Sequence, residues 1–376
     1  MILDYFDKQL LIDRLLKINK NLIILVCIIF SCGLLLLYSA SNGSVKPWAI
    51  RQLIYFLAFF PIMILIAIID IKFWFKHSYV VYAGGLFLLL LVAIIGHKSM
   101  GATRWLNLGI IRIQPSEIMK ICLILGIAKY FFQNNLTDIR KTKKLIIPIT
   151  MYFVPFVLIL KQPNLGTALI LTAIMISTLF FVGVKIWKFV LCFVLCLCSV
   201  PIAWQYGLHD YQKQRVMTFL NPDSDPLNSG YNITQSKIAI GSGGIWGNGF
   251  LKGTQGQLEF LPEKHTDFIF TILAEEFGFI GCSSVMMMFV ILFMFFVYII
   301  IKCNHTYGKI IVGGVFINIF CHFFINIGMI TGILPVVGTP FPLLSYGGSI
   351  TVATLISMGF VLNVDINRNE ELRILD

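Results

Sequence analysis

Residues 21–40 read NLIILVCIIFSCGLLLLYSA, and this stretch contains no charged side chain. About 20 residues of α-helix cross a hydrocarbon core of about 30 Å, so the stretch predicts a transmembrane helix. Nine further apolar runs are bounded by charged or turn-forming residues in the same way. The expected spans are residues 21–40, 50–69, 78–96, 115–132, 145–160, 165–183, 187–205, 268–300, 310–331 and 350–366. The sequence therefore predicts an all-α polytopic membrane protein with ten transmembrane helices, forming a single domain over residues 1–376.

The composition excludes a soluble fold. Of the 376 residues, 58% are hydrophobic and 12% are charged, and the mean hydropathy is +0.86. Soluble domains contain about 25% charged residues, so most of this surface must face hydrocarbon. The formal net charge is +11, but the cations lie mainly in short loops, where membrane topology explains them and no nucleic-acid partner is expected. The nine cysteines form no CxxC pair, which argues against a disulfide scaffold or a zinc site.

The distribution of Lys and Arg predicts the orientation of the chain. If the N-terminus lies inside, the short loops hold 16 of these cations inside and six outside. Cytoplasmic loops of membrane proteins hold the excess of Lys and Arg. We therefore expect both termini and the 133–144 loop to be cytoplasmic.

Residues 206–266 are neither apolar nor short. They include three prolines and the Gly-rich run GSGGIWGNGFLKGTQGQ at 241–257. Such turn residues predict an irregular segment, and its aromatic side chains favour packing over disorder. The orientation above makes this segment one long extracytoplasmic loop between the seventh and eighth spans.

Charged side chains inside the expected spans are the clearest functional signal, because a charge in hydrocarbon is costly unless it is paired or hydrated. The fourth span begins QPSEIMK, which places Glu117 and Lys120 three residues apart on one helical face. Two interpretations remain open. The residues form an ion pair at a helix start, or they line a substrate cavity.

The eighth span begins EKHTDFIFTILAEEFG at residues 263–278. As a helix, this segment would place Asp267, Thr271 and Glu275 on one face, with Asp267 at the outer membrane surface and Glu275 about two turns deeper. A carboxylate beside a long polar loop can accept a proton from a substrate that enters from the membrane. Stabilisation by the helix dipole is the alternative role for Asp267. His265, two residues from Asp267, is a further candidate for substrate binding.

Four cations can reach the outer face of the membrane: Arg104, Arg112, Lys120 and Arg215. Together they would form an anion site suited to phosphate. Separate surface cations are the alternative interpretation.

Several segments in order along the chain are specific enough to indicate a family. They are GATRWLNLG (101–109), QPSEIMK (114–120), KQPNLGTAL (161–169), the stretch 230–279, and ILPVVGTPFPLLSYGGS (333–349). They closely resemble the shape, elongation, division and sporulation family of bacterial membrane proteins. Within that family, the wording GTQGQLEFLPEKHTDFIF (253–270) is more similar to the elongation member than to the division member.

This resemblance implies a peptidoglycan glycosyltransferase of the bacterial inner membrane, which polymerises lipid II during cell elongation with loss of undecaprenyl pyrophosphate. It also implies a class B penicillin-binding protein as transpeptidase partner within the elongation machinery. By motif, Asp267 matches the family's essential carboxylate. Arg104, Trp105, Glu117 and Lys120 match segments that line the same outer cavity.

The chemistry implied by the resemblance suits these residue types. Glycosyl transfer from a lipid pyrophosphate requires a base for the acceptor hydroxyl and positive charge for the leaving group. We expect Asp267 to be the base, and Arg104, Lys120, Arg215 or a divalent cation to supply the charge. Because pyrophosphate is stabilised well by such ions, Mg²⁺ or Mn²⁺ is expected near Asp267, although the sequence shows no ligand cage.

Three alternatives remain. A lipid II flippase would also require a hydrated polar cavity, but its charges should follow a path across the membrane, whereas the charges here cluster towards the outer leaflet. The division-type member of the same family would share most of these motifs. A scaffold without catalysis would have no need for a carboxylate at Asp267.

Overall fold

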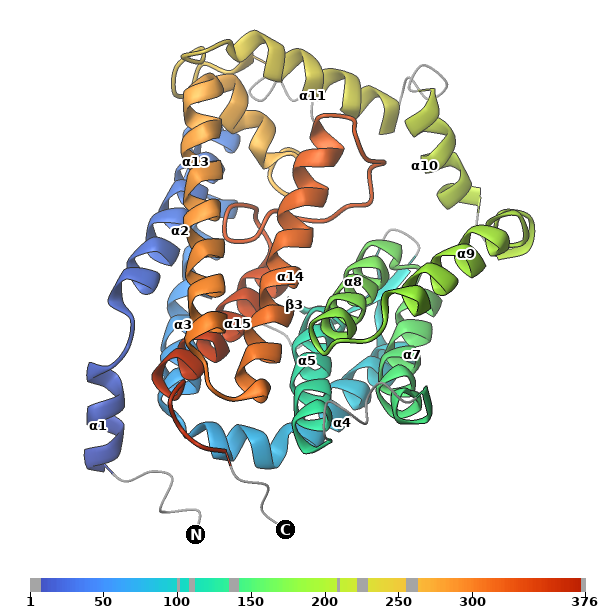
Figure 1. The fold of residues 1–376 in the computed structure, drawn as a ribbon. Helices are drawn as coiled ribbons and strands as arrows, with labels where there is room; N and C mark the ends of the chain where they lie inside the picture. Colours follow the sequence, from blue (N-terminus) through green and yellow to red (C-terminus); the bar gives the residue numbers. More distant parts are fainter. Residues whose placement is uncertain are drawn as a thin grey trace.

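The computed structural model describes residues 8–99, 102–107, 112–134, 142–207, 210–221, 229–254 and 263–372. Most of these residues are helical, and α1 lies at the same end of the molecule as the C-terminal end of α15 (Figure 1). Within the described residues, seven helices are long and apolar enough to cross a membrane: Lys20–Ala40, Trp48–Ile68, Ile71–Ile94, Lys143–Lys161, Ile269–Lys302, Thr306–Ile330 and Gly348–Ile366. This confirms a mainly helical, multi-pass membrane protein.

The elements follow the apolar runs of the sequence. The first half contains α1 (Lys8–Leu16), α2 (Lys20–Ala40), α3 (Trp48–Ile68), α4 (Ile71–Ile95), β1 (His97–Ser99), β2 (Ala102–Asn107), β3 (Arg112–Ile113), α5 (Pro115–Gln133), η2 (Thr142–Leu145), α7 (Ile146–Lys161) and α8 (Leu165–Phe181). The second half contains α9 (Ile186–Ile202), η3 (Ala203–Gly207), α10 (Asp210–Leu220), α11 (Ser229–Gly243), α13 (Ile269–Lys302), α14 (Thr306–Ile330) and α15 (Gly348–Ile366). Helices α5, α8 and α9 also coincide with expected spans.

Local capping explains where α4 begins. The side chain of Asp70 accepts a hydrogen bond from the Lys72 backbone N–H at 2.7 Å, which is the usual way to satisfy a first-turn donor. The helix therefore begins at Ile71, and the start expected at residue 78 is too late. Lys72 and Lys76 lie on the helix and do not end it, because their long side chains can reach the interface.

The segment between α4 and α5 contains three short strands. Strands β1, β2 and β3 form an antiparallel sheet in that order, with His97 opposite Trp105 and Leu106 opposite Ile113. The all-α prediction is therefore wrong in this detail. A ladder satisfies backbone groups near the membrane surface that an open loop would leave to water. It also fixes Arg104 and Trp105 on the central strand β2.

The long segment 206–266 also differs from the prediction of an irregular loop. It contains α10 and α11, and α11 packs against both α13 and α14. Polar composition concealed α11, whose apolar residues are too few for a strong pattern; Ile233 and Ala239 are nevertheless buried. Contact with α13 and α14 stabilises this helix, as tertiary packing does for most helices.

The core of the bundle is built around α15. Of its span, 83% is buried inside the protein, and it packs against α3, α14 and α5. The Asn363 side chain donates hydrogen bonds to the carbonyls of Ile66 and Ala67 at 3.0 Å each, which joins α15 to the end of α3. Helix α9 is the opposite case, since Ile186, Trp187 and Phe193 are all more than half exposed and suit contact with hydrocarbon.

Helix α13 changes direction at Gly278 (Figure 1). This residue has φ 61° and ψ −157°, a conformation that is essentially restricted to glycine. A Cβ atom there would lie 2.4 Å from the backbone nitrogen of Gly247. The bend explains why the eighth apolar run is too long for one simple crossing.

Candidate active site

A cavity of about 180 Å³ lies where several helix starts, strand β2 and two loops meet. Its wall contains four of the predicted site residues, Arg104, Trp105, Glu117 and Asp267, and also His322. These residues come from β2, α5, the 263–268 turn and α14. The fold thus brings together side chains that are more than 200 positions apart in the sequence.

The turn before α13 positions Asp267. The backbone carbonyl of Asp267 accepts a hydrogen bond from Asn326 Nδ2 at 2.9 Å, and the same nitrogen donates to the Thr339 carbonyl at 2.8 Å. The backbone N–H of Tyr346 donates to the His265 carbonyl at 2.9 Å. Asp267 is therefore held between α14 and the chain that leads into α15.

Gly338 allows a loop to approach the Asp267 carboxylate. Gly338 has φ +69°, and a Cβ atom built on it would lie 3.4 Å from Asp267 Oδ2. A larger residue would adopt this backbone conformation only with strain, and its Cβ would be in van der Waals contact with the carboxylate. The backbone conformation at this position thus explains why the VVGTP segment has a glycine there.

Glu117, Lys120 and His322 form a buried cluster beneath the cavity. Lys120 Nζ lies 2.9 Å from Glu117 Oε2, and it donates a hydrogen bond to His322 Nε2 at 2.7 Å. Because the ammonium is the donor, His322 Nε2 is the acceptor and its ring proton lies on Nδ1. The Lys120 side chain is 0% exposed, so the cavity wall consists of Glu117 and His322 with Lys120 behind them.

Arg104 is held by the turn between α7 and α8. Its Nε donates to the Gln162 carbonyl at 3.0 Å, and its terminal nitrogen donates to the Pro163 carbonyl. A guanidinium has five N–H donors in a fixed plane, so backbone anchoring orients the group without using all of them. Arg104 thus brings a positive charge to the cavity wall.

Three helices begin at this cavity. Its lining includes Gln114 and Glu117 from the start of α5, Asn164 and Thr167 from the start of α8, and Gly347, Ser349 and Ile350 from the start of α15. Each helix N-terminus has a partial positive charge and backbone N–H groups that attract anions. The cavity therefore combines these dipoles with the charge of Arg104.

Three sequence predictions are placed differently. The His265 ring stacks on the Trp48 ring, with 4.2 Å between the ring centroids, and His265 does not line the cavity. Arg215 lies on α10, which packs against α11, and its side chain is outside the described part of the structure. Asp267 and Glu275 do not lie on one helical face as predicted, because residues 263–268 form turns and the helix begins only after them. The Glu275 side chain instead accepts a hydrogen bond at Oε1 from Thr254 at 3.2 Å.

His322 is the residue that sequence reasoning missed. From the sequence alone, His322 is typical of a buried, hydrogen-bonded histidine, because no second histidine follows at helical spacing on its own span. The available signal was its position: an ionisable side chain within a span marks a functional site by default. Its partner Lys120 lies on another helix, so no local pattern could pair the two.

The cavity wall has one carboxylate, Asp267, that could serve as a ligand of the expected divalent cation. Among the described residues, no group of three or more His, Cys, Asp or Glu side chains could hold a metal ion. Glu117, the other carboxylate in the wall, is paired with Lys120. Asp267 suits a Mg²⁺-type ion that takes its remaining ligands from substrate phosphates and water, which is how such ions are often bound.

The comparisons with known proteins agree with this architecture. The sequence profile of the FtsW/RodA/SpoVE family, described as cell cycle protein, matches residues 19–370. Peptidoglycan glycosyltransferase MrdB of Escherichia coli K12 is 43% identical over 296 residues, which are 78% of this chain and 78% of MrdB. The probable peptidoglycan glycosyltransferase FtsW of Idiomarina loihiensis is 32% identical over 360 residues, which are 93% of this chain and 87% of that relative.

Two solved structures have the same fold. A chain from a peptidoglycan synthase complex, described as coordinating polymerization and crosslinking, is 28% identical with a TM-score of 0.81, and the match covers 94% of this chain and 99% of that one. The rod shape determining protein RodA of Thermus thermophilus is 25% identical with a TM-score of 0.71, and the match covers 94% of this chain and 98% of RodA.

The fold and the relatives define a multi-pass membrane protein of the peptidoglycan glycosyltransferase class. The chain belongs to the FtsW/RodA/SpoVE family. The higher identity to MrdB than to FtsW, together with the RodA structure, confirms the resemblance to the elongation member. The predicted enzyme class is confirmed as well.

Proposed function

We propose that this chain polymerises lipid II into glycan strands during cell elongation, with the cavity around Asp267 as its active site. The observation that supports this most directly is that Asp267, Glu117 and Arg104 line one cavity although they come from separate elements. The relatives named peptidoglycan glycosyltransferase support the reaction class. The division-type member is the less favoured alternative, because this chain is 32% identical to the FtsW relative and 43% identical to MrdB.

Glycosyl transfer in this site requires one base and one leaving-group stabiliser. The 4-hydroxyl oxygen of the acceptor sugar attacks the anomeric carbon of the lipid-linked donor. A glycosidic C–O bond forms, and the bond from the anomeric carbon to the pyrophosphate oxygen breaks. Asp267 accepts the hydroxyl proton, and undecaprenyl pyrophosphate leaves with the bonding electron pair.

The positive features of the wall suit the leaving pyrophosphate. Arg104 is fixed by backbone carbonyls, and three helix N-termini face the same space. Oriented charges and dipoles that need no rearrangement stabilise a developing anion more than mobile ones do. A Mg²⁺ or Mn²⁺ ion anchored on Asp267 would neutralise further charge on the pyrophosphate. Lys120 acts through Glu117 and His322, because its own side chain is buried.

The proposed placement is the bacterial inner membrane, with both termini cytoplasmic and residues 206–266 largely outside. Ten crossings follow if α5, α8 and α9 also span the membrane, in addition to the seven longer candidates. Helix α5 is not among the seven apolar candidates because it contains three charged residues, Glu117, Lys120 and Lys129. The excess of cations in the inner loops supports this orientation.

The proposed partner is a class B penicillin-binding protein, a transpeptidase that crosslinks the strands within the elongation machinery. The similar chain from a complex described as coordinating polymerization and crosslinking supports such a partner. The two activities are chemically sequential, because glycan strands must exist before their peptides can be joined.

A lipid II flippase is the alternative from a different class. It would move the same lipid pyrophosphate, but it would release no pyrophosphate product and form no glycan. Polymerisation of purified lipid II by the purified full chain in detergent tests the proposal directly. We expect glycan strands that increase in amount when the transpeptidase partner is added. Transport of lipid II in vesicles together with no polymer under either condition would favour the flippase.

A further inference from the structure

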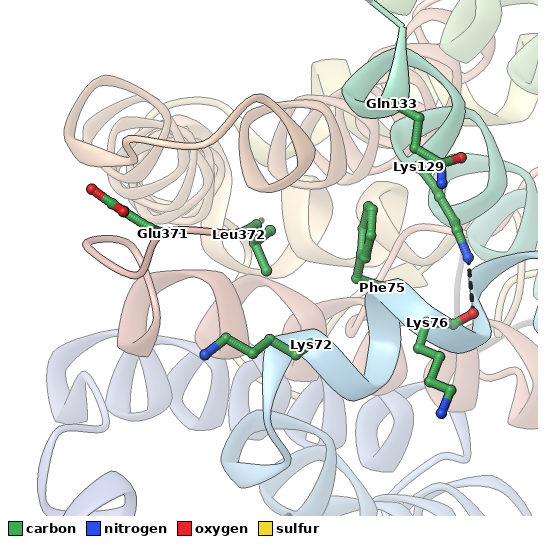
Figure 2. Close-up of a pocket in the computed structure, with 7 residues that line it drawn as sticks. All are labelled: Lys72, Phe75, Lys76, Lys129, Gln133, Glu371 and Leu372. Carbon is green, nitrogen blue, oxygen red and sulfur yellow. Dashed lines mark hydrogen bonds between the residues drawn. The ribbon is translucent and has the colours of Figure 1, made fainter. Parts of the chain in front are cut away.

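A second cavity, of about 520 Å³, lies at the other end of α5. It is formed by the first turns of α4, the last turns of α5 and the chain that follows α15 (Figure 2). On α5, the lining residues of the two cavities that lie nearest each other are Glu117 and Lys129, which are 12 residues apart, so about 18 Å of helix separates the cavities. The second cavity is therefore a separate site. It lies near the end of the molecule where α1 and the end of α15 meet.

Three lysines line this second cavity: Lys72, Lys76 and Lys129. Lys129 Nζ donates a hydrogen bond to the Lys76 carbonyl at 2.9 Å, and it lies 5.2 Å and 4.7 Å from the ring centroids of Phe75 and Tyr79. The carbonyl uses one of its three N–H donors. Within the described part of the chain, an ion pair is present for Lys72, with Glu370 at 3.9 Å, but not for Lys76 or Lys129. The pocket thus has an excess of positive charge.

An apolar track leaves the pocket along α4. At 100° per residue, Val80, Phe87 and Ile94 lie on the same helical face as Lys76. Their side chains are 67%, 62% and 83% exposed, so at these three positions the face is mostly uncovered by the described part of the chain. A cationic pocket that opens onto an exposed apolar track has the two parts that an amphiphile with an anionic head requires.

We propose that this pocket binds the phosphate of an anionic phospholipid from the cytoplasmic leaflet, with its acyl chains along the Val80–Phe87–Ile94 face of α4. Basic pockets between membrane helices on the cytoplasmic side recognise lipid head groups in this way. The inference depends on the proposed membrane orientation but not on glycosyl transfer. A soluble phosphate would use the lysines and leave the track without a role.

Glu371 also lines the pocket, on the side opposite Lys76 and Lys129 (Figure 2), and its carboxylate lowers the net positive charge of the lining. Replacing it with glutamine keeps the size of the side chain and removes a negative charge. The proposal therefore predicts changes of opposite sign: lysine variants lose lipid, and the Glu371→Gln variant gains it. A merely misfolded protein cannot produce the gain.

The test is native mass spectrometry of the purified full chain with equal amounts of phosphatidylglycerol and phosphatidylcholine. We expect wild type to retain several-fold more phosphatidylglycerol. Lys76→Gln/Lys129→Gln should reduce this to the phosphatidylcholine level, and Glu371→Gln should increase it. The matched control Lys185→Gln/Lys188→Gln removes two cations at the start of α9, which is also proposed to be cytoplasmic, and should retain lipid like wild type.

Three results would overturn the inference. The first is equal retention of the two lipids by wild type. The second is wild-type retention by the Lys76→Gln/Lys129→Gln protein, or no gain in Glu371→Gln. The third is displacement of phosphatidylglycerol by excess inorganic phosphate but not by chloride at the same ionic strength, which would assign the pocket to a soluble anion. Lipid II polymerisation is measured in parallel, so a failure of the active-site proposal is recognised separately.

Discussion

The Lys120 ammonium lies 2.9 Å from the Glu117 carboxylate, one turn away on α5, and the two side chains are 0% and 6% exposed. Burying two charges has a large desolvation cost, and an apolar pair of similar volume would often be at least as stable. The pair is therefore poorly explained by stability alone. Since Glu117 faces the cavity with Asp267, the pair is better explained by a role toward the substrate.

Exchanging the two charges tests that role. In Glu117→Lys/Lys120→Glu, an ion pair is still available, but the ammonium would face the cavity and the carboxylate would lie against His322. We expect the double variant to fold and to polymerise lipid II at least about tenfold more slowly, as a loss of about 1.4 kcal/mol or more in transition-state stabilisation. Glycan formed per folded protein is the measurement. Full activity would reduce the pair to a structural one.

His322 should stabilise the buried Lys120 ammonium, because its Nε2 accepts a hydrogen bond from Lys120 Nζ. His322→Leu would leave a buried ammonium without that acceptor, which costs about 1–3 kcal/mol, more for charged groups. His322→Gln retains a carbonyl oxygen and should recover part of the loss. Thermal unfolding in detergent compares the three proteins. If the Leu variant unfolds at the wild-type temperature, the 2.7 Å contact has no energetic weight.

The partly buried His265 should make the folded protein less stable at low pH. Burial, the largest effect, lowers the pKa of His265 below its ordinary value; the charge of Glu263 acts in the opposite direction, and that of Lys264 lowers the pKa further. The unfolded chain then takes up a proton at a higher pH than the folded one, so stability is lost as pH falls below about 6.5. His265→Phe keeps the stacking on Trp48 and should remove this part of the pH dependence. Melting temperatures measured from pH 7.5 down to 5.5 give the comparison, and an equally steep decline in the Phe variant would contradict the prediction.

Gly278 should not tolerate a side chain. Gly278→Ala would impose a strained conformation, at about 1–3 kcal/mol, and would also place its Cβ 2.4 Å from the Gly247 nitrogen. The membrane level of folded protein should therefore fall. Gly241→Ala is the matched control, because its added Cβ meets no atom within 4 Å and alanine favours the α11 helix. Equal levels of the two variants would show that the bend does not depend on glycine.

The sequence predicted the spans well because apolar length is a direct consequence of membrane thickness. The first span, expected at 21–40, coincides with α2 at Lys20–Ala40, and the last, expected at 350–366, begins two residues after the start of α15. Asp267 and Glu117 were predicted as site residues because charges are rare inside apolar runs. Arg104 and Trp105 were expected at the same cavity through the family resemblance of the GATRW segment.

Features that depend on distant contacts were missed. The bend at Gly278 depends on Gly247, and the place of Glu275 depends on Thr254, so a continuous helical face was the natural but wrong expectation. The partnership of Lys120 with His322 joins residues 202 positions apart. Helix α11 gains its stability from α13 and α14, which no propensity argument includes.

The central claim is that Asp267 is the base or the metal-anchoring carboxylate of glycosyl transfer. The most direct measurement is glycan formed from lipid II in detergent by equal amounts of folded wild type, Asp267→Asn and Glu263→Gln. Glu263 is a carboxylate in the same turn that accepts a hydrogen bond from Thr266 at 3.0 Å, outside the cavity lining. We predict a decrease of about 10²-fold or more for Asp267→Asn, the usual scale of general acid–base catalysis, and near-normal polymerisation for Glu263→Gln. Near-normal polymerisation by Asp267→Asn would contradict the assignment.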